Sequence, residues 1–179
     1  MRLFIGALLD DPVGLALRSV QDDLHARSLK GRFPDLGNLH LTLAFLGELP
    51  EAALDLVKAC MDKTVSGFGA PFFLSCSHIG LFPRRGGDLY YAGFSPSPKL
   101  IRLHTRLTGA LADAGVPYDP KPFLPHVTLG RNVTLQPGAS AQSIPIAVPA
   151  LSVSAIALME SARAQGAPVY TKRHFAYLI

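Results

Sequence analysis

Apolar residues along the chain repeat with two spacings, one typical of strands and one typical of helices. A continuous apolar run over residues 2–9 predicts a buried strand. Three later segments repeat an apolar residue every three or four positions, which predicts amphipathic helices. In the first, which begins near Pro12, these residues are Val13, Leu17, Val20 and Leu24. In the other two they are Leu54, Val57 and Met61, and then Leu100, Leu103, Leu107 and Leu111 before Gly115.

Shorter apolar segments bounded by Gly and Pro predict the remaining strands. They cover residues 38–46, 71–80, 88–94, 144–149, 151–159 and 169–177. The order strand, helix, strand occurs about twice, which suggests a duplicated lobe, and the hairpin connections favour antiparallel pairing. We predict an α+β fold in a single bilobal domain over residues 1–179. It has two pseudo-symmetric lobes, each a largely antiparallel sheet with helices packed outside, and an active-site cleft between the lobes.

Composition limits the class of protein. The chain has 179 residues, of which 49% are hydrophobic, enough to bury a core in one domain or two small, intimate lobes. No apolar stretch reaches the roughly 18 to 20 residues that cross a bilayer, and the first strand has no charged leader before it. We therefore predict a cytoplasmic protein without a membrane partner. The net charge of +4 suits an anionic partner but does not identify one.

Two short segments far apart in the chain carry the same pattern. They read His40-Leu41-Thr42-Leu43 and His126-Val127-Thr128-Leu129. Residues i and i+2 of a strand leave the same face, so each imidazole shares a surface with a hydroxyl while the apolar residues turn toward the core. If the fold brings the two segments together, a cleft holds two histidines and two hydroxyls.

Such a group has the parts needed to break a phosphodiester. An imidazole with a pKa near 6.5 can give a proton to a departing alkoxide or take one from an attacking water, and each transfer is worth typically 10²–10⁴-fold. The two hydroxyls can donate to the non-bridging phosphoryl oxygens. A zinc site at His40 and His126 is disfavoured because no Asp, Glu or Cys lies at ligand spacing beside either. The other histidines belong to no motif and are not assigned a role.

The two motifs and their flanks resemble the 2H phosphoesterase superfamily, and most closely its branch of RNA 2′,3′-cyclic phosphodiesterases, also called 2′-5′ RNA ligases. The resemblance spans nearly the whole chain, from Arg2-Leu3-Phe4-Ile5 to Pro168-Val169-Tyr170. It implies hydrolysis of a 2′,3′-cyclic phosphate to a 2′-phosphomonoester without cofactor or metal. RNA ends or small cyclic nucleotides are the implied substrates, and we expect a monomer.

The resemblance also implies roles for single residues. His40 would be the proton donor and His126 the proton acceptor, while Thr42 and Thr128 would hold the phosphate. Arg131 follows the second motif and would contact the phosphate or form a salt bridge. Further substrate contacts are expected from Phe4, Tyr91 and Phe82. The segment Asp88-Leu89-Tyr90-Tyr91 departs from the family, which often has Arg and Trp there, although a Tyr can still stack on a base.

Two other functions remain open from the sequence. The same groups, run in reverse, would join or cleave 2′-5′ linkages, for example on tRNA halves. Alternatively, the chain would be a nucleotide- or RNA-binding module that has lost turnover, although both motif histidines are present.

Overall fold

A computed structural model describes residues 1–179 and contains one eight-stranded sheet and one two-stranded sheet. Seven strands of the large sheet follow the order β10-β9-β1-β3-β7-β6-β5, and β2 pairs with β7 off this path. All pairs are antiparallel. The strands are β1 (Arg2–Leu8), β2 (Ser28–Arg32), β3 (His40–Glu48), β5 (Cys76–Phe82), β6 (Asp88–Phe94), β7 (His126–Leu135), β9 (Ala155–Ala164) and β10 (Ala167–Tyr177), with β4 (Phe72–Leu74) and β8 (Leu151–Val153) in the small sheet.

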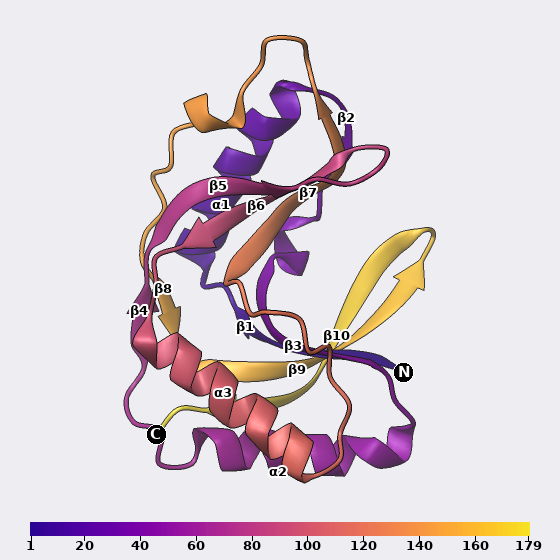
Figure 1. Ribbon diagram of the computed structural model, residues 1–179, viewed down its shortest axis with the longest axis vertical. Coiled ribbons are helices and arrows are strands. Elements are labelled where there is room, and N and C mark those ends of the chain that lie inside the picture. The colour runs from indigo at the N-terminus through magenta and orange to yellow at the C-terminus, as the bar shows by residue number, and fades with distance from the viewer.

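The large sheet divides into two lobes that meet at one residue pair. Leu41 of β3 and Val127 of β7 are the only registered partners between these two strands. Lobe 1 contains β1, β3, β9 and β10, and lobe 2 contains β2, β5, β6 and β7; they occupy the lower and upper parts of Figure 1. The predicted α+β fold with two largely antiparallel lobes is confirmed.

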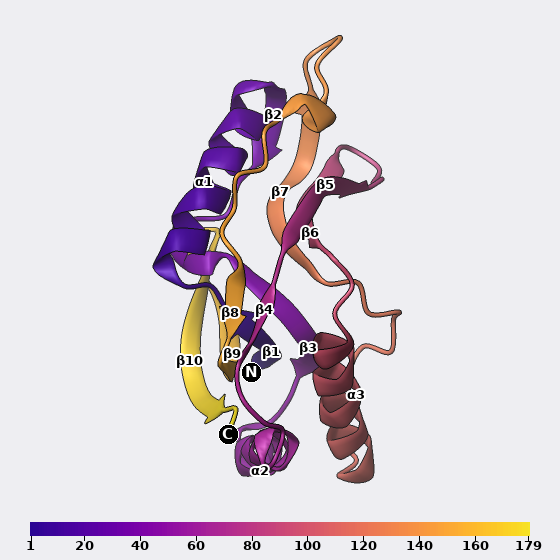
Figure 2. The ribbon, with the colours of Figure 1, turned by 90° about the vertical axis from the view of Figure 1, so that its left-hand side faces the viewer.

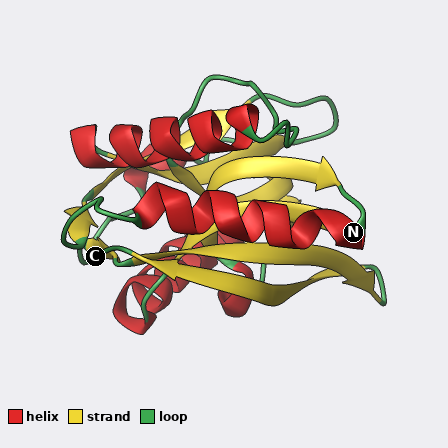
Figure 3. Ribbon diagram, turned by 90° about the horizontal axis from the view of Figure 1, so that it is seen from below, coloured by secondary structure: helices red, strands yellow, loops and turns green.

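The helices exchange between the lobes. Helix α1 (Asp11–Ala26) follows β1 of lobe 1 but packs on β2 and β7 of lobe 2. Helix α3 (Pro98–Asp113) follows β6 of lobe 2 but packs on β3 of lobe 1 and on α2 (Leu54–Val65), as Figures 1 and 2 show. Seen from below, α2 and α3 lie in front of the strands (Figure 3). The lobes are therefore not two successive duplicated segments, as the sequence suggested, because each takes a helix from the other.

Side-chain caps mark the starts of α1 and α3, and apolar stripes explain all three helices. Asp10 accepts a hydrogen bond from the Val13 amide at 3.0 Å, and Ser97 accepts one from the Leu100 amide at 3.2 Å. A proline at the first turn of α1 and α3 supplies a backbone angle suited to a helix start. The predicted apolar positions of all three helices are buried and belong to one continuous core of 42 buried residues.

Three strand predictions need correction. Residues 144–149 form no strand, because Pro145 and Pro149 have no amide hydrogen to donate to a neighbouring strand. The segments 71–80 and 151–159 each divide between two strands, β4 and β5 in the first and β8 and β9 in the second. Strand β2 was not predicted, because most of its residues are exposed and it has no apolar alternation.

The last two strands form a long hairpin. Gln165 and Gly166, with φ angles of 52° and 82°, make the two-residue turn between β9 and β10. No helix has the length and apolar character required to cross a membrane.

Candidate active site

The four motif side chains lie on one face where the lobes meet. The pairing of Leu41 with Val127 is antiparallel, so the residue before one lies opposite the residue after the other. His40 is therefore placed beside Thr128, and His126 beside Thr42. Leu41 and Val127 are fully buried, whereas the four motif residues are half-buried. Because side chains alternate between the two faces of each strand, one face is apolar and the other carries two imidazoles and two hydroxyls.

Both imidazoles are held in the same way. Nδ1 of His40 is 2.8 Å from the Asn38 carbonyl, and Nδ1 of His126 is 2.7 Å from the Leu124 carbonyl. A carbonyl only accepts, so Nδ1 of each ring donates and each neutral ring keeps a lone pair on Nε2. Neither Nε2 has a hydrogen-bond partner within the protein. Each ring can thus accept a proton at Nε2, and donates one from the same atom when it is protonated.

Aromatic side chains support each imidazole. Phe4 stacks on His40 with ring centroids 4.5 Å apart, and Tyr170 meets the same imidazole edge-on at 5.3 Å. Tyr91 and Phe82 meet His126 edge-on at 5.4 and 5.5 Å. The predicted contact residues Phe4, Tyr91 and Phe82 therefore lie at the motif face. Phe4 and Tyr91 are buried, with exposed fractions of 3% and 8%, so they buttress the imidazoles, and the half-buried Phe82 has the more accessible ring.

Burial and nearby positive charge change the titration of both rings. Burial lowers the pKa of His40 below its ordinary value of 6.5; the Asn38 carbonyl opposes this shift, and the charges of Arg131 and His126 add to it. Burial also lowers the pKa of His126, opposed by the Leu124 carbonyl and assisted by the charge of Arg131. Both rings are therefore neutral at pH 7 in the absence of a bound anion.

Arg131 faces the motif residues because of an irregularity in β7. Tyr90 pairs with Gly130, but the next residue, Tyr91, pairs with Thr128, so β7 contains one extra residue there. Strict alternation would place Arg131 on the core face with Val127 and Leu129. After the extra residue, Arg131 is exposed and its charge acts on both imidazoles. Its guanidinium forms no salt bridge, which removes one of its two predicted roles.

A third histidine lies on the same face of lobe 2. Gly93 pairs with His126, and His78 pairs with Gly93, so the three residues share one face. A Cβ on Gly93 would lie 2.3 Å from Cε1 and 2.4 Å from Nε2 of His78, so the missing side chain gives this ring its space. Ser77 Oγ lies 2.8 Å from Nδ1 of His78. Sequence reasoning did not assign His78, because the only signal is Gly93, on the next strand.

Asp88, the departure from the family pattern, has a local structural role. Its carboxylate accepts a hydrogen bond from the Arg84 amide at 3.1 Å and so closes the loop between β5 and β6. The acidic side chain is thereby engaged in the hairpin.

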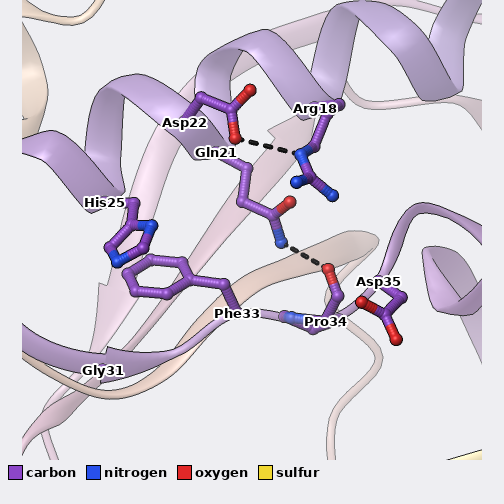
Figure 4. A pocket seen from close by; sticks show the side chains of 8 residues that line it. All are labelled: Arg18, Gln21, Asp22, His25, Gly31, Phe33, Pro34 and Asp35. Atoms are coloured by element: carbon purple, nitrogen blue, oxygen red, sulfur yellow. Dashed lines mark hydrogen bonds and ion pairs between the residues drawn. The ribbon is translucent and has the colours of Figure 1, made fainter.

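A polar hollow of about 310 Å³ lies between α1 and residues 31–35 (Figure 4). Gln21, which is almost fully buried, donates from its amide nitrogen to the carbonyls of Pro34 and Leu129 at 2.8 and 2.9 Å. Arg18 and Asp22 form an ion pair at its rim. The hollow contains none of the motif residues, but Gln21 ties α1 to the strand that carries His126 and Thr128.

No group of three or more His, Cys, Asp or Glu side chains is arranged to hold a metal ion. The only titrating side chains of the motifs are the two imidazoles.

Comparison with known proteins identifies the family of this chain. The profile of the 2′-5′ RNA ligase superfamily matches residues 10–165. A Thermus thermophilus protein named RNA 2′,3′-cyclic phosphodiesterase is 30% identical over 178 residues, which cover 96% of this chain and 87% of that protein. A Thermotoga maritima protein of the same name is 28% identical over 132 residues, 73% of this chain and 70% of that one.

Solved structures match over the whole length. A Thermus thermophilus crystal structure superimposes with a TM-score of 0.82 at 29% identity and covers 99% of this chain and 98% of that chain. Escherichia coli LigT complexed with 3′-AMP has a TM-score of 0.72 at 25% identity, with 99% of this chain and 96% of that chain covered. The resemblance inferred from the two motifs is confirmed: this chain belongs to the 2′-5′ RNA ligase superfamily.

Proposed function

We propose that this protein hydrolyses 2′,3′-cyclic phosphates at RNA ends or on small nucleotides to 2′-phosphomonoesters by acid–base catalysis. One observation carries the proposal. The Leu41–Val127 pair brings two His-x-Thr segments onto one face, with both Nε2 atoms free. Relatives named RNA 2′,3′-cyclic phosphodiesterase, and a LigT structure with 3′-AMP, support the same substrate class.

The reaction begins with the phosphate between the two imidazoles. Its negative charge favours a protonated ring and so opposes the lowering of the histidine pKa values by burial. Thr42, Thr128 and Arg131 donate to the non-bridging oxygens, where charge increases in the transition state. The fixed donors and rings also hold the phosphorus in line between base and acid.

Proton transfer then follows the assignment made from the resemblance. Nε2 of His126 takes a proton from water as the water oxygen attacks phosphorus. Nε2–H of His40 protonates the 3′ oxygen as the bond from phosphorus to that oxygen breaks. The product is a 2′-phosphomonoester with a free 3′ hydroxyl, and one proton must pass from His126 to His40 or through solvent before the next cycle. No step uses a metal ion.

The test uses the purified protein in EDTA with adenosine 2′,3′-cyclic phosphate and with an oligoribonucleotide that ends in a 2′,3′-cyclic phosphate. We expect a 2′-phosphate product from wild type, and a fall of about 10²–10⁴-fold in kcat for His40→Gln and for His126→Gln. His25→Gln, on the exposed face of α1, is the matched control and should retain full activity. Dependence on added metal, a 3′-phosphate product, or unchanged activity in either motif variant would reject the mechanism.

Two other outcomes have their own readouts. Joining of tRNA halves by the wild type, lost in His40→Gln and His126→Gln, would show transfer to a hydroxyl in place of water. Tight binding of a nucleoside 2′-phosphate without turnover would indicate a binding module.

A further inference from the structure

Two arginines lie directly opposite each other at the edge of the motif face. Arg32 of β2 and Arg131 of β7 are registered antiparallel partners, so their side chains leave the same face of the sheet. Both residues are exposed. Like charges directly opposite each other destabilise a sheet, so this arrangement has a cost unless an anion lies between them.

The protein itself supplies no such anion. Neither guanidinium lies within 4.0 Å of a carboxylate, whereas Arg18 and Arg173 both form ion pairs. Asp88, on the strand next to β7, accepts its hydrogen bond from the Arg84 amide. The two opposed guanidinium groups thus remain free for an external ligand.

The strand register shows how far the pair of Arg32 and Arg131 lies from the motif residues. Strands β3 and β2 both pair with β7, β3 at Val127 and β2 from Arg131 onward. At about 3.3 Å per residue, Arg131 lies roughly 10 Å along β7 from Thr128. Arg131 nevertheless acts on both imidazoles, whereas Arg32 contributes to the pKa of neither. Arg131 therefore faces the central phosphate, and Arg32 continues the positive surface beyond it.

Further positive charge borders this surface. The β5–β6 loop carries Arg84 and Arg85, and a Cβ on its Gly87 would lie 2.5 Å from the carbonyl carbon of Asn132, so loop and strand are in close contact. Lys30 lies two residues before Arg32 on β2 and is also exposed. Rows of exposed basic residues are typical of a surface that follows a nucleic-acid backbone.

We propose that Arg32, beside the Arg131 that faces the cyclic phosphate, binds the internucleotide phosphate next to the cyclic end of an RNA strand. This inference rests on the proposed function and extends it. The preferred substrate class is an oligoribonucleotide with at least one internucleotide phosphate, because an isolated cyclic mononucleotide has no group for Arg32 to bind. Arg32 is accordingly a residue that determines substrate length, without a role in proton transfer.

The experiment compares adenosine 2′,3′-cyclic phosphate with the dinucleotide ApA that ends in a 2′,3′-cyclic phosphate, for wild type and Arg32→Gln. We expect Arg32→Gln to raise KM for the dinucleotide about 5- to 10-fold and to change kcat/KM for the mononucleotide by less than 2-fold. Lys99→Gln removes an exposed positive charge from α3 and should change neither substrate. Circular dichroism checks that each variant is folded.

Binding provides a readout that does not depend on turnover. The dissociation constant of a fluorescent oligoribonucleotide ending in a 2′-phosphate is measured at several salt concentrations. The logarithm of the dissociation constant rises with the logarithm of the salt concentration. The slope of this rise should be smaller by about 0.7 in Arg32→Gln, the value for one lost phosphate contact on a single strand. The inference would be overturned if Arg32→Gln changed the kinetics of the mononucleotide and the dinucleotide equally, or if it changed neither the KM for the dinucleotide nor the salt slope. It would also be overturned if Lys99→Gln had the same effect as Arg32→Gln. Failure of wild type to hydrolyse either substrate would instead reject the proposed function, while the salt slope would still test Arg32.

Discussion

The ring of Phe4 stacks on the imidazole of His40 at a centroid distance of 4.5 Å and an interplanar angle of 27°. Phe4 comes from β1 and His40 from β3, so the packing of neighbouring strands fixes the orientation of a proposed catalytic group. Burial of this ring is also the main cause of its lowered pKa.

The variant Phe4→Leu tests this support. We expect about 1–2 kcal/mol loss of stability from the smaller buried side chain, and a fall in kcat of roughly 10-fold because the imidazole gains freedom. Greater solvation should move the pKa of His40 back up toward its ordinary value, which a proton NMR titration would detect. Phe73→Leu is the matched control, because Phe73 is 69% exposed and touches neither histidine. An unchanged His40 pKa and kcat in Phe4→Leu would contradict the supporting role.

Gly80 provides space for Tyr91, which packs on His126. A Cβ at position 80 would lie 2.3 Å from Cζ of the Tyr91 ring, and Tyr91 is buried, so Gly80→Ala forces this ring to move. We expect a loss of about 1–3 kcal/mol of stability in thermal or urea unfolding, together with lower activity. Gly109→Ala is the control, because no atom lies within 4 Å of its Cβ and alanine favours a helix. Equal stability of the two variants would refute this explanation.

Arg131 affects both binding and titration. Arg131→Gln should raise KM for a cyclic phosphate about 10-fold or more, since a hydrogen bond to a charged group is worth about 1.5–3 kcal/mol. The same variant should raise the pKa of both His40 and His126, because a nearby positive charge is lost. Arg131→Lys keeps the charge and should leave both pKa values lowered. If the two variants titrate alike, the electrostatic account of Arg131 is wrong.

The motif threonines are expected to act through their hydroxyls. Thr42→Val and Thr128→Val keep the side-chain shape and remove one donor each. We expect kcat/KM to fall by about 100-fold and stability to change by no more than about 1 kcal/mol, because these side chains are half-buried. Thr105→Val, on the exposed face of α3, should have full activity. A comparable loss in that control would show that the effect is not specific to the motifs.

The lowered histidine pKa values link stability to pH. The unfolded rings titrate near pH 6.5 and the folded rings below it, so the unfolded chain binds more protons in the interval between. The free energy of unfolding should therefore be at its full value above pH 6.5 and should decrease as the pH falls through the folded pKa values. The double variant His40→Gln, His126→Gln should lose less stability than wild type between pH 7.5 and 5. Equal losses would show that other groups cause the acid sensitivity.

Activity should depend on pH for the same reason. One imidazole must be protonated and the other neutral, so kcat/KM should be bell-shaped, with its maximum below pH 6.5 in the free enzyme. A flat profile between pH 5 and 8, with chemistry as the slow step, would contradict these roles.

Local patterns were sufficient to predict the motif faces and the helices. The i, i+2 spacing placed His40 with Thr42 and His126 with Thr128, and the apolar stripes predicted all three helices. The adjacency of the motifs depends on the long-range Leu41–Val127 pair, which the repeated order of strand, helix and strand and the family resemblance both suggested but which no local pattern specifies.

The features that were missed depend on neighbours distant in the chain. Arg131 itself was expected at the site from the family resemblance, but the extra residue in β7 that turns it toward the motif face is indicated by no periodicity. Arg32 lies on an exposed strand without apolar alternation. His78 shares a face with His126 only through the pairing of β5 with β6. Tyr170 contacts His40 but lies near the far end of the chain.

The exchange of α1 and α3 has a consequence for how the molecule comes apart. No single cut in the backbone can release one lobe with its own helices, because each lobe would leave a helix behind on the other. Fragments divided between β6 and α3 should therefore be unstable separately and should recover structure when mixed.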